Sequence, residues 1–190
     1  MADKPPNPFY NINLNDTMNR SKKEKRLLLT IRLLIIFFMA ALVISGATAF
    51  PLETELGLFC KILGISTDVP AANYTGFQHW IAWIYEGVST TNKAYPFLAY
   101  GTDWLAFAHI AIAIAFFGVY YKPVRNIWIV YWAMILCVAI MPVIFICGSI
   151  RQIPFYWQLI DSSFGIFGIV PLLMLRYYIL KLERFYPGRY

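Results

Sequence analysis

The sequence predicts an all-α, multi-pass membrane protein with four transmembrane helices and two short interfacial helices in one long outer loop. Hydrophobic residues make up 59% of the 190 residues and charged residues only 14%. Ordinary soluble domains carry about 25% charged residues, so this chain cannot cover itself with a polar surface. The apolar residues gather in four runs. At a rise of about 1.5 Å per residue, each run is long enough to cross a hydrocarbon core about 30 Å thick.

The four runs give the bounds of the predicted transmembrane helices and of the parts between them. We expect helices at about 27–50, 102–121, 127–147 and 159–182, which together form a membrane domain over 27–182. Residues 1–26 are expected to form a flexible basic cytoplasmic tail, and residues 183–190 a second one. The first 20 residues are polar and the run that follows is too long for the apolar region of a cleavable signal peptide.

Charge placement orients the predicted helices. Of the 16 Lys and Arg residues, 13 lie before or at the start of the first helix, between the second and third, or near the end of the fourth. The positive-inside rule assigns such a face to the cytoplasm, which predicts an integral protein of the plasma (inner) membrane with both termini cytoplasmic. The net charge of +6 is then explained by topology and by attraction to anionic lipids. No base-reading motif accompanies it, so a nucleic-acid partner is not expected.

The long loop over 51–101 is expected to fold, since about 50 residues without structure are unusual. The stretch "LETELGLFCKILG" has apolar residues at helical spacing and ends at Gly64, which suits a helix C-terminus. The stretch "TGFQHWIAWIYEG" repeats the pattern and is expected to end at Gly87. Both stretches are rich in aromatic residues, so they are predicted to lie in the membrane interface as an outer cap.

Small residues and prolines shape the last two helices. Ser162, Gly165 and Gly168 fall near one face of the fourth helix, which predicts close packing against a neighbour. Pro142 and Pro171 lie inside the third and fourth helices, where each frees a backbone carbonyl and kinks the helix.

Polar residues within the membrane domain are the candidates for function, because buried ionisable groups are costly there. Asp103 opens the stretch "YGTDWLAFAHIAIAIAFFG" and His109 lies two turns inside it. We interpret these two as the candidate acid–base (catalytic) residues. The candidate ligand-binding residues at the same predicted end are His79, Glu86, Trp104, Arg151 and Asp161.

Simpler structural roles are open to several of these residues. Asp103 and Asp161 are predicted to begin helices, where an acid caps the first turn and meets the helix dipole favourably. His109 can be satisfied by a hydrogen bond between helices. A metal site would use His79 and His109, with Glu86 or Asp103 as a further ligand. A non-covalent haem would be bound by His79 and His109 alone. No HxxH, ExxH or HExxH spacing accompanies them, so no metal ligand or cofactor is assigned.

Two classes of function follow from this pattern. The first is a membrane protein that binds, or acts on, a hydrophobic small molecule or lipid through the polar residues of its outer side. The second is a non-catalytic subunit or assembly factor of a larger membrane complex, or a homo-oligomer, whose polar residues serve as structural bonds. The clustered polarity favours the first class, whereas small size and short connections favour the second. No nucleophile motif or phosphate-binding loop decides between an enzyme and a binding protein.

One part of the chain resembles a known family. "KPVRNIWIVYWAMILCVAIMPVI" at 122–144 and "FGIFGIVPLLMLR" at 164–176 look similar to the EXPERA-type four-helix membrane proteins. The resemblance implies cytoplasmic chain ends and a long first outer loop. Its matching positions are mostly apolar and place no acidic site residue of that family on this sequence, so it implies no activity.

Overall fold

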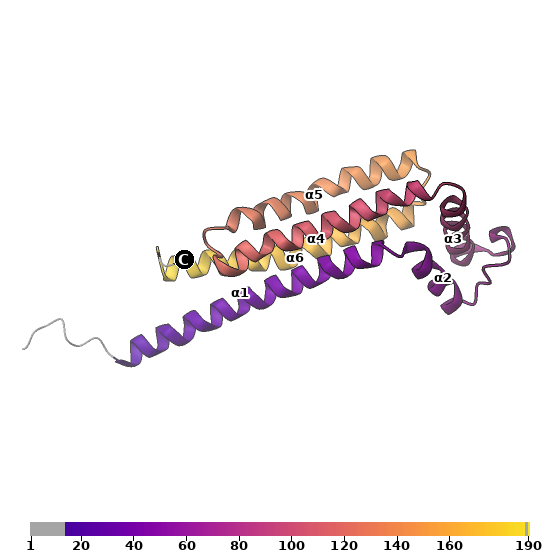
Figure 1. Cartoon of the computed structure of the whole chain (residues 1–190). Helices are drawn as coiled ribbons and strands as arrows, with labels where there is room; N and C mark the ends of the chain where they lie inside the picture. The colour runs from indigo at the N-terminus through magenta and orange to yellow at the C-terminus, as the bar shows by residue number, and fades with distance from the viewer. Residues whose placement is uncertain (1–13, 189) are drawn as a thin grey trace, which may run out of the picture. The chain divides into compact units, whose positions relative to one another are not determined.

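The computed structural model describes residues 14–188 and 190, with side chains from Met18 onward, and every regular element in that part of the chain is a helix (Figure 1). The predicted all-α class is therefore confirmed. The long helices are α1 (Leu14–Ala49), α3 (Gly76–Ala94), α4 (Tyr100–Tyr121), α5 (Ile127–Ile150) and α6 (Phe155–Phe185). The short elements are α2 (Leu52–Ile62) and the 3-10 helices η1 (Ala71–Asn73) and η2 (Pro96–Ala99).

Four helical segments among the described residues are long and apolar enough to cross a membrane. They are Met18–Ala49, Pro96–Tyr121, Ile127–Ile150 and Phe155–Phe185. The chain divides into two compact units. The bundle unit consists of residues up to Phe38 and from Phe116 onward, and the loop unit of Met39–Ala115. Helices α1 and α4 each contribute one part to both units.

The first helix begins earlier than the sequence indicated. Residues 14–26 were expected in a flexible tail, yet they form the first turns of α1, and residues 1–13 lie outside the described part. Lys, Arg and Glu make up six of the seven residues 20–26 and are good helix formers. It also has tertiary partners, because the Tyr186 hydroxyl donates to the Arg20 carbonyl at 2.7 Å. The predicted second tail is likewise shorter, since α6 continues to Phe185.

The core of the bundle unit lies at the basic end of α1, α4, α5 and α6. Its fully or nearly buried side chains come from all four of them: Leu27, Ile31 and Ile35 of α1, Phe116 and Val119 of α4, Ile129, Val130 and Ala133 of α5, and Leu172, Leu175, Ile179 and Leu182 of α6. The start of α1, the end of α4, the start of α5 and the end of α6 therefore meet in one core. This arrangement brings the three basic regions of the sequence to the same end, as the charge pattern predicted.

Helices α5 and α6 approach closely at glycine. A Cβ on Gly165 would lie 2.9 Å from the carbonyl oxygen of Cys137 and 2.7 Å from the Met141 methyl carbon. A Cβ on Gly168 would lie 3.3 Å from the Cys137 sulfur. Ser162, one turn before Gly165, is buried and donates its hydroxyl to the Gln158 carbonyl at 2.7 Å. The small-residue face predicted for the fourth helix is therefore confirmed as a packing face.

In the loop unit, the first predicted cap helix ends where the sequence indicated. Gly64 has a φ of +70° and follows α2, with its N–H donating to the Lys61 carbonyl at 3.2 Å. The Ile65 N–H donates to the Cys60 carbonyl at 2.8 Å. These two bonds form a Schellman motif, whose left-handed position favours glycine.

The second cap helix does not end at Gly87, and that expectation was wrong. Helix α3 passes through Gly87 and continues to Ala94. A glycine inside a helix costs about 1 kcal/mol relative to alanine, which the packing of the following turns offsets. Ser89 is buried there, and Asn92 bonds to α2. The extension matters for the candidate site, because Ser89 and Asn92, which were expected in a loop, lie on α3 and bond to Glu53 of α2.

Candidate functional site

The seven residues proposed from the sequence are divided between the two units. His79, Glu86, Asp103, Trp104 and His109 belong to the loop unit. Arg151 and Asp161 belong to the bundle unit. Within the loop unit the structure brings together two pairs, His79 with Glu86 and Asp103 with Trp104, and places His109 further along α4.

His79 and Glu86 both bind the backbone of Ala71. The Nδ1 atom of His79 lies 2.7 Å from the Ala71 carbonyl oxygen, and a carboxylate oxygen of Glu86 accepts the Ala71 N–H at 3.1 Å. Because a carbonyl only accepts, Nδ1 carries the proton and Nε2 is the nitrogen left for other partners. Ala71 is 3% exposed and begins η1. These two hydrogen bonds hold the segment between α2 and α3 against α3. This structural role uses part of the hydrogen-bonding capacity of each side chain.

Asp103 and Trp104 lie in the first turns of α4. The helix begins at Tyr100, so Asp103 is inside the first turn rather than at the cap, where it still meets the helix dipole favourably. The Trp104 ring makes edge contacts with Tyr100 and Phe107, with centroids 5.9 Å apart in both pairs. These four residues line an open hollow of about 270 Å³. Trp104 is 57% exposed, as expected of an aromatic side chain at a membrane interface.

His109 is bound to its own helix. Its Nδ1 atom lies 2.8 Å from the Leu105 carbonyl oxygen, so this nitrogen also carries the proton. His109 lies six positions after Asp103, which places the two residues about 120° apart around α4 and about 9 Å apart along it. Helix α1 passes close by, since a Cβ on Gly46 would lie 3.0 Å from the His109 Cβ and 2.9 Å from the Ala106 carbonyl oxygen. The acid–base roles of the two residues stay a prediction.

Arg151 and Asp161 lie near the connection between α5 and α6. Arg151 is exposed and is the residue at which α5 ends. Asp161 was expected to cap a helix, but α6 begins at Phe155, so Asp161 lies in the second turn. Pro154 is the N-cap residue of α6, and its carbonyl accepts the N–H groups of Trp157 and Gln158 in the first turn. The capping interpretation of Asp161 is therefore wrong, and its ligand-binding role stays a prediction.

Metal coordination was one alternative for the histidines. Among the residues that the structure describes, no three His, Cys, Asp or Glu side chains lie close enough together to hold a metal ion. The haem alternative stays untested.

A cleft that sequence reasoning missed lies in the loop unit, lined by the residues that follow α1 and by parts of α2, α3, η2 and α4. Its volume is about 300 Å³. Its polar lining residues are Glu53, Thr54, Thr91, Asn92 and Thr102, and its apolar ones include Phe50, Leu52, Val88 and Leu98. Phe50 follows the end of α1 and Thr102 lies in the first turn of α4, so the cleft lies where two candidate membrane spans end.

Glu53 is the ionisable group of this cleft. The side-chain amide of Asn92 donates to its carboxylate at 2.9 Å. Hydrogen bonds from Asn92 and Ser89, together with the charge of Lys93, lower the pKa of Glu53 below its ordinary value. The carboxylate is therefore ionised at neutral pH. One sequence signal could have indicated these partners of Glu53. If α3 is extended past Gly87, the three-residue spacing of Ser89 and Asn92 puts both on the same face of the helix.

The geometry thus defines a class of molecule, a helical protein with four candidate membrane spans and a cleft that holds a carboxylate beside the ends of two of them. Comparisons of the chain with known protein families, with curated proteins and with solved structures found no match.

Proposed function

We propose that this protein is an integral membrane protein that binds an amphiphile with an amine-bearing head group in the Glu53 cleft. The observation that carries the proposal is the ionised Glu53 carboxylate, held by Asn92 in a cleft that also has apolar walls. Ligand sites of this kind combine apolar surface with a few fixed polar groups.

The lining chemistry selects the head group. Glu53 is the charged residue among those that line the cleft, so the described lining is acidic overall. An ammonium group can pair with the Glu53 carboxylate, and neighbouring threonine hydroxyls can accept hydrogen bonds from its remaining N–H groups. A carboxylate or sulfate head group would meet repulsion instead. The apolar walls formed by Phe50, Leu52 and Leu98 suit the first carbons of an alkyl chain.

The position of the cleft supports an amphiphile rather than a soluble amine. The cleft lies beside the ends of two candidate membrane spans. If these helices cross a bilayer, the cleft lies at head-group depth, and an alkyl chain can continue from it into the hydrocarbon. The positive-inside rule places this end on the outer side and the basic end in the cytoplasm of a cell whose plasma membrane holds the protein.

Photolabelling tests the proposal. A long-chain alkylamine that carries a diazirine near its amine is added to the purified full-length protein in phosphatidylcholine nanodiscs, and the labelled peptides are identified by mass spectrometry. We expect labelling within residues 50–54 and 87–102 that excess unlabelled amine suppresses. Glu53→Gln should reduce it at least about tenfold, which corresponds to about 1.4 kcal/mol.

Glu55→Gln is the matched control, because Glu55 lies in the same first turn of α2 but not in the cleft lining. It should label as the wild type does. Equal labelling of Glu53→Gln and wild type at these peptides would exclude the cleft as the amine site.

A second candidate function is a non-catalytic subunit or assembly factor. The observation in its favour is the part of α5 from Met134 to Ile150, where no side chain is buried. A surface of this kind can pack against a helix of a second membrane polypeptide. A second polypeptide that stays bound at fixed stoichiometry through detergent purification would favour this candidate over the first.

A further inference from the structure

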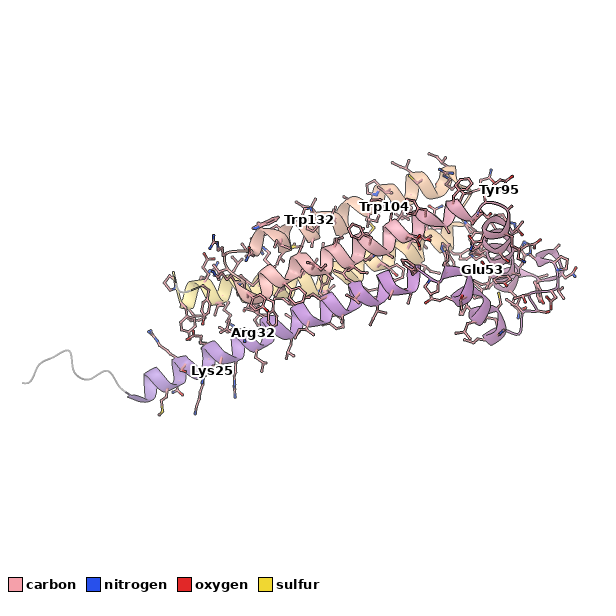
Figure 2. All side chains as sticks on the ribbon, viewed as in Figure 1. Lys25, Arg32, Glu53, Tyr95, Trp104 and Trp132 are labelled. Atoms are coloured by element: carbon pink, nitrogen blue, oxygen red, sulfur yellow. The ribbon has the colours of Figure 1, made fainter. Side chains whose placement is uncertain are left out.

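The basic segment at the start of α1 carries five cations within seven residues: Arg20, Lys22, Lys23, Lys25 and Arg26. All five are exposed, and the segment is a continuous part of α1 (Figure 2 labels Lys25 and Arg32 on this helix). A rigid helix fixes the direction of each side chain, so the cations divide into different faces rather than forming a diffuse cloud.

The single acid of this segment is turned away from one of those faces. Glu24 is 8% exposed and accepts a hydrogen bond from the hydroxyl of Tyr190. At about 100° per residue, Lys22 and Arg26 lie about 160° around the helix from Glu24. The face with Lys22 and Arg26 therefore carries positive charge without a compensating carboxylate, while the buried face carries Glu24 and Leu27.

The same face continues as an apolar stripe along the candidate membrane span. Leu29 and Leu33 follow Lys22 and Arg26 at helical spacing and are 58% and 57% exposed. Ile36, one turn further, is also exposed. A stripe of cations that passes directly into exposed aliphatic side chains matches the two parts of a phospholipid, a phosphate head group and an acyl chain.

Contacts with the end of α6 hold this face in place. The Tyr186 hydroxyl donates to the Arg20 carbonyl at 2.7 Å, and the Lys23 ammonium lies 4.3 Å from the centre of the Phe185 ring. Lys23 thus lies on the side of α1 that meets α6, and Arg20 lies on the same side, about 40° around the helix from the buried Glu24. These contacts fix the rotation of the helix, so that Lys22 and Arg26 point away from α6.

We propose that Lys22 and Arg26, with the Leu29–Leu33 stripe, form an oriented site for an anionic phospholipid. The phosphate binds between the two cations, and an acyl chain follows the stripe. This site is independent of the Glu53 cleft, which lies in the other unit.

Two double variants of equal charge test the orientation. Lys22→Gln with Arg26→Gln removes the outward cations, and Arg20→Gln with Lys23→Gln removes two cations on the side of α6. The purified full chain is incubated with equimolar phosphatidylglycerol and phosphatidylcholine, and the retained lipids are counted by native mass spectrometry. Each basic residue near an anionic surface contributes about 1 kcal/mol, or about fivefold in affinity.

We expect the selectivity for phosphatidylglycerol to fall about 25-fold in the Lys22/Arg26 variant and far less in the Arg20/Lys23 variant. An equal fall in both variants would show a diffuse basic surface and overturn the oriented site. Unchanged selectivity in the Lys22/Arg26 variant would overturn it too. Displacement of the lipid by inorganic phosphate alone would reassign the site to a free anion. A thermal unfolding measurement on both variants excludes loss of the fold as the cause.

Discussion

The side-chain amide of Asn92 donates a hydrogen bond of 2.9 Å to the carboxylate of Glu53, and this bond joins the last turns of α3 to the first turn of α2. The two residues are 39 positions apart in the sequence. Both residues line the Glu53 cleft, so the stability of this corner of the loop unit and the charge of the proposed site depend on the same carboxylate.

This relationship predicts a loss of local stability in acid. The pKa of Glu53 is lower in the folded state than its ordinary value of 4.5, chiefly because of the Asn92 hydrogen bond. A carboxyl group with a lowered folded pKa contributes stability that is present above the unfolded pKa and lost as the pH falls through the folded value. We expect amide exchange in residues 88–94, corrected for intrinsic rates, to accelerate below about pH 4.5. Glu53→Gln should remove this pH dependence; the same acceleration in that variant would assign it to another group.

A second prediction separates packing from function at His109. His109→Gln should cost about 0–1 kcal/mol of stability, the usual worth of a polar contact inside a membrane protein. Asp103→Asn should be mild in both stability and function, because Asp103 lies in the first turn of α4 without a described hydrogen bond to its carboxylate. If His109 is an acid–base or ligand group, its variant should lose ligand turnover or binding while it keeps its fold. Two variants indistinguishable from wild type would leave both residues with structural roles alone.

Gly165 gives a prediction about helix packing. In Gly165→Ala the new Cβ would lie 2.9 Å from the Cys137 carbonyl oxygen, a backbone atom that cannot move without shifting α5. We expect a destabilisation of about 1–3 kcal/mol from this overpacking. Gly101→Ala is the control, since nothing lies within 4 Å of its Cβ position, and it should be neutral or gain about 0.5–1 kcal/mol. Unfolding in mixed detergent micelles measures both variants; a neutral Gly165→Ala would contradict the close approach.

The proposed topology is tested with reporters. A reporter fused after Arg189 should be cytoplasmic, and one inserted near Asp68 should be exported, because the basic regions share one end of the bundle unit. An exported reporter after Arg189 would contradict the assignment of the basic end.

The aromatic α3 should lie in the membrane interface. Lipids brominated near the head group should therefore quench tryptophan fluorescence more than lipids brominated deep in the chains.

Much of the fold could be predicted from the sequence because its signals are strong and local. Long apolar runs fixed the existence of four long helices, Gly64 marked the end of α2, and Ser162, Gly165 and Gly168 marked a packing face. The helix ends were less predictable. Gly87 and the polar segment after it look like a loop, yet tertiary contacts of Ser89 and Asn92 keep α3 helical. The tail before residue 27 proved helical over 14–26 for a similar reason, its contacts with the end of α6.

The candidate site was harder to predict, because it depends on which polar groups already have partners. His79, Glu86 and His109 stand out in the sequence as ionisable residues in apolar surroundings, but each bonds to nearby backbone. Glu53 resembled an ordinary acid in the first turn of a helix. Its role as the charged group of a cleft depends on Asn92, and that contact exists only because α3 extends beyond Gly87.

The central claim, that the Glu53 carboxylate selects an amine head group, is tested most directly by competition. Dodecylamine, dodecanol and dodecanoate are compared at equal measured concentrations in the bilayer for their power to suppress photolabelling of residues 50–54 and 87–102. The account predicts that the amine competes at least about tenfold better than the alcohol, a difference of about 1.4 kcal/mol, that dodecanoate competes least, and that Glu53→Gln abolishes this order. Equal competition by dodecanoate and dodecylamine in the wild-type protein would contradict the claim.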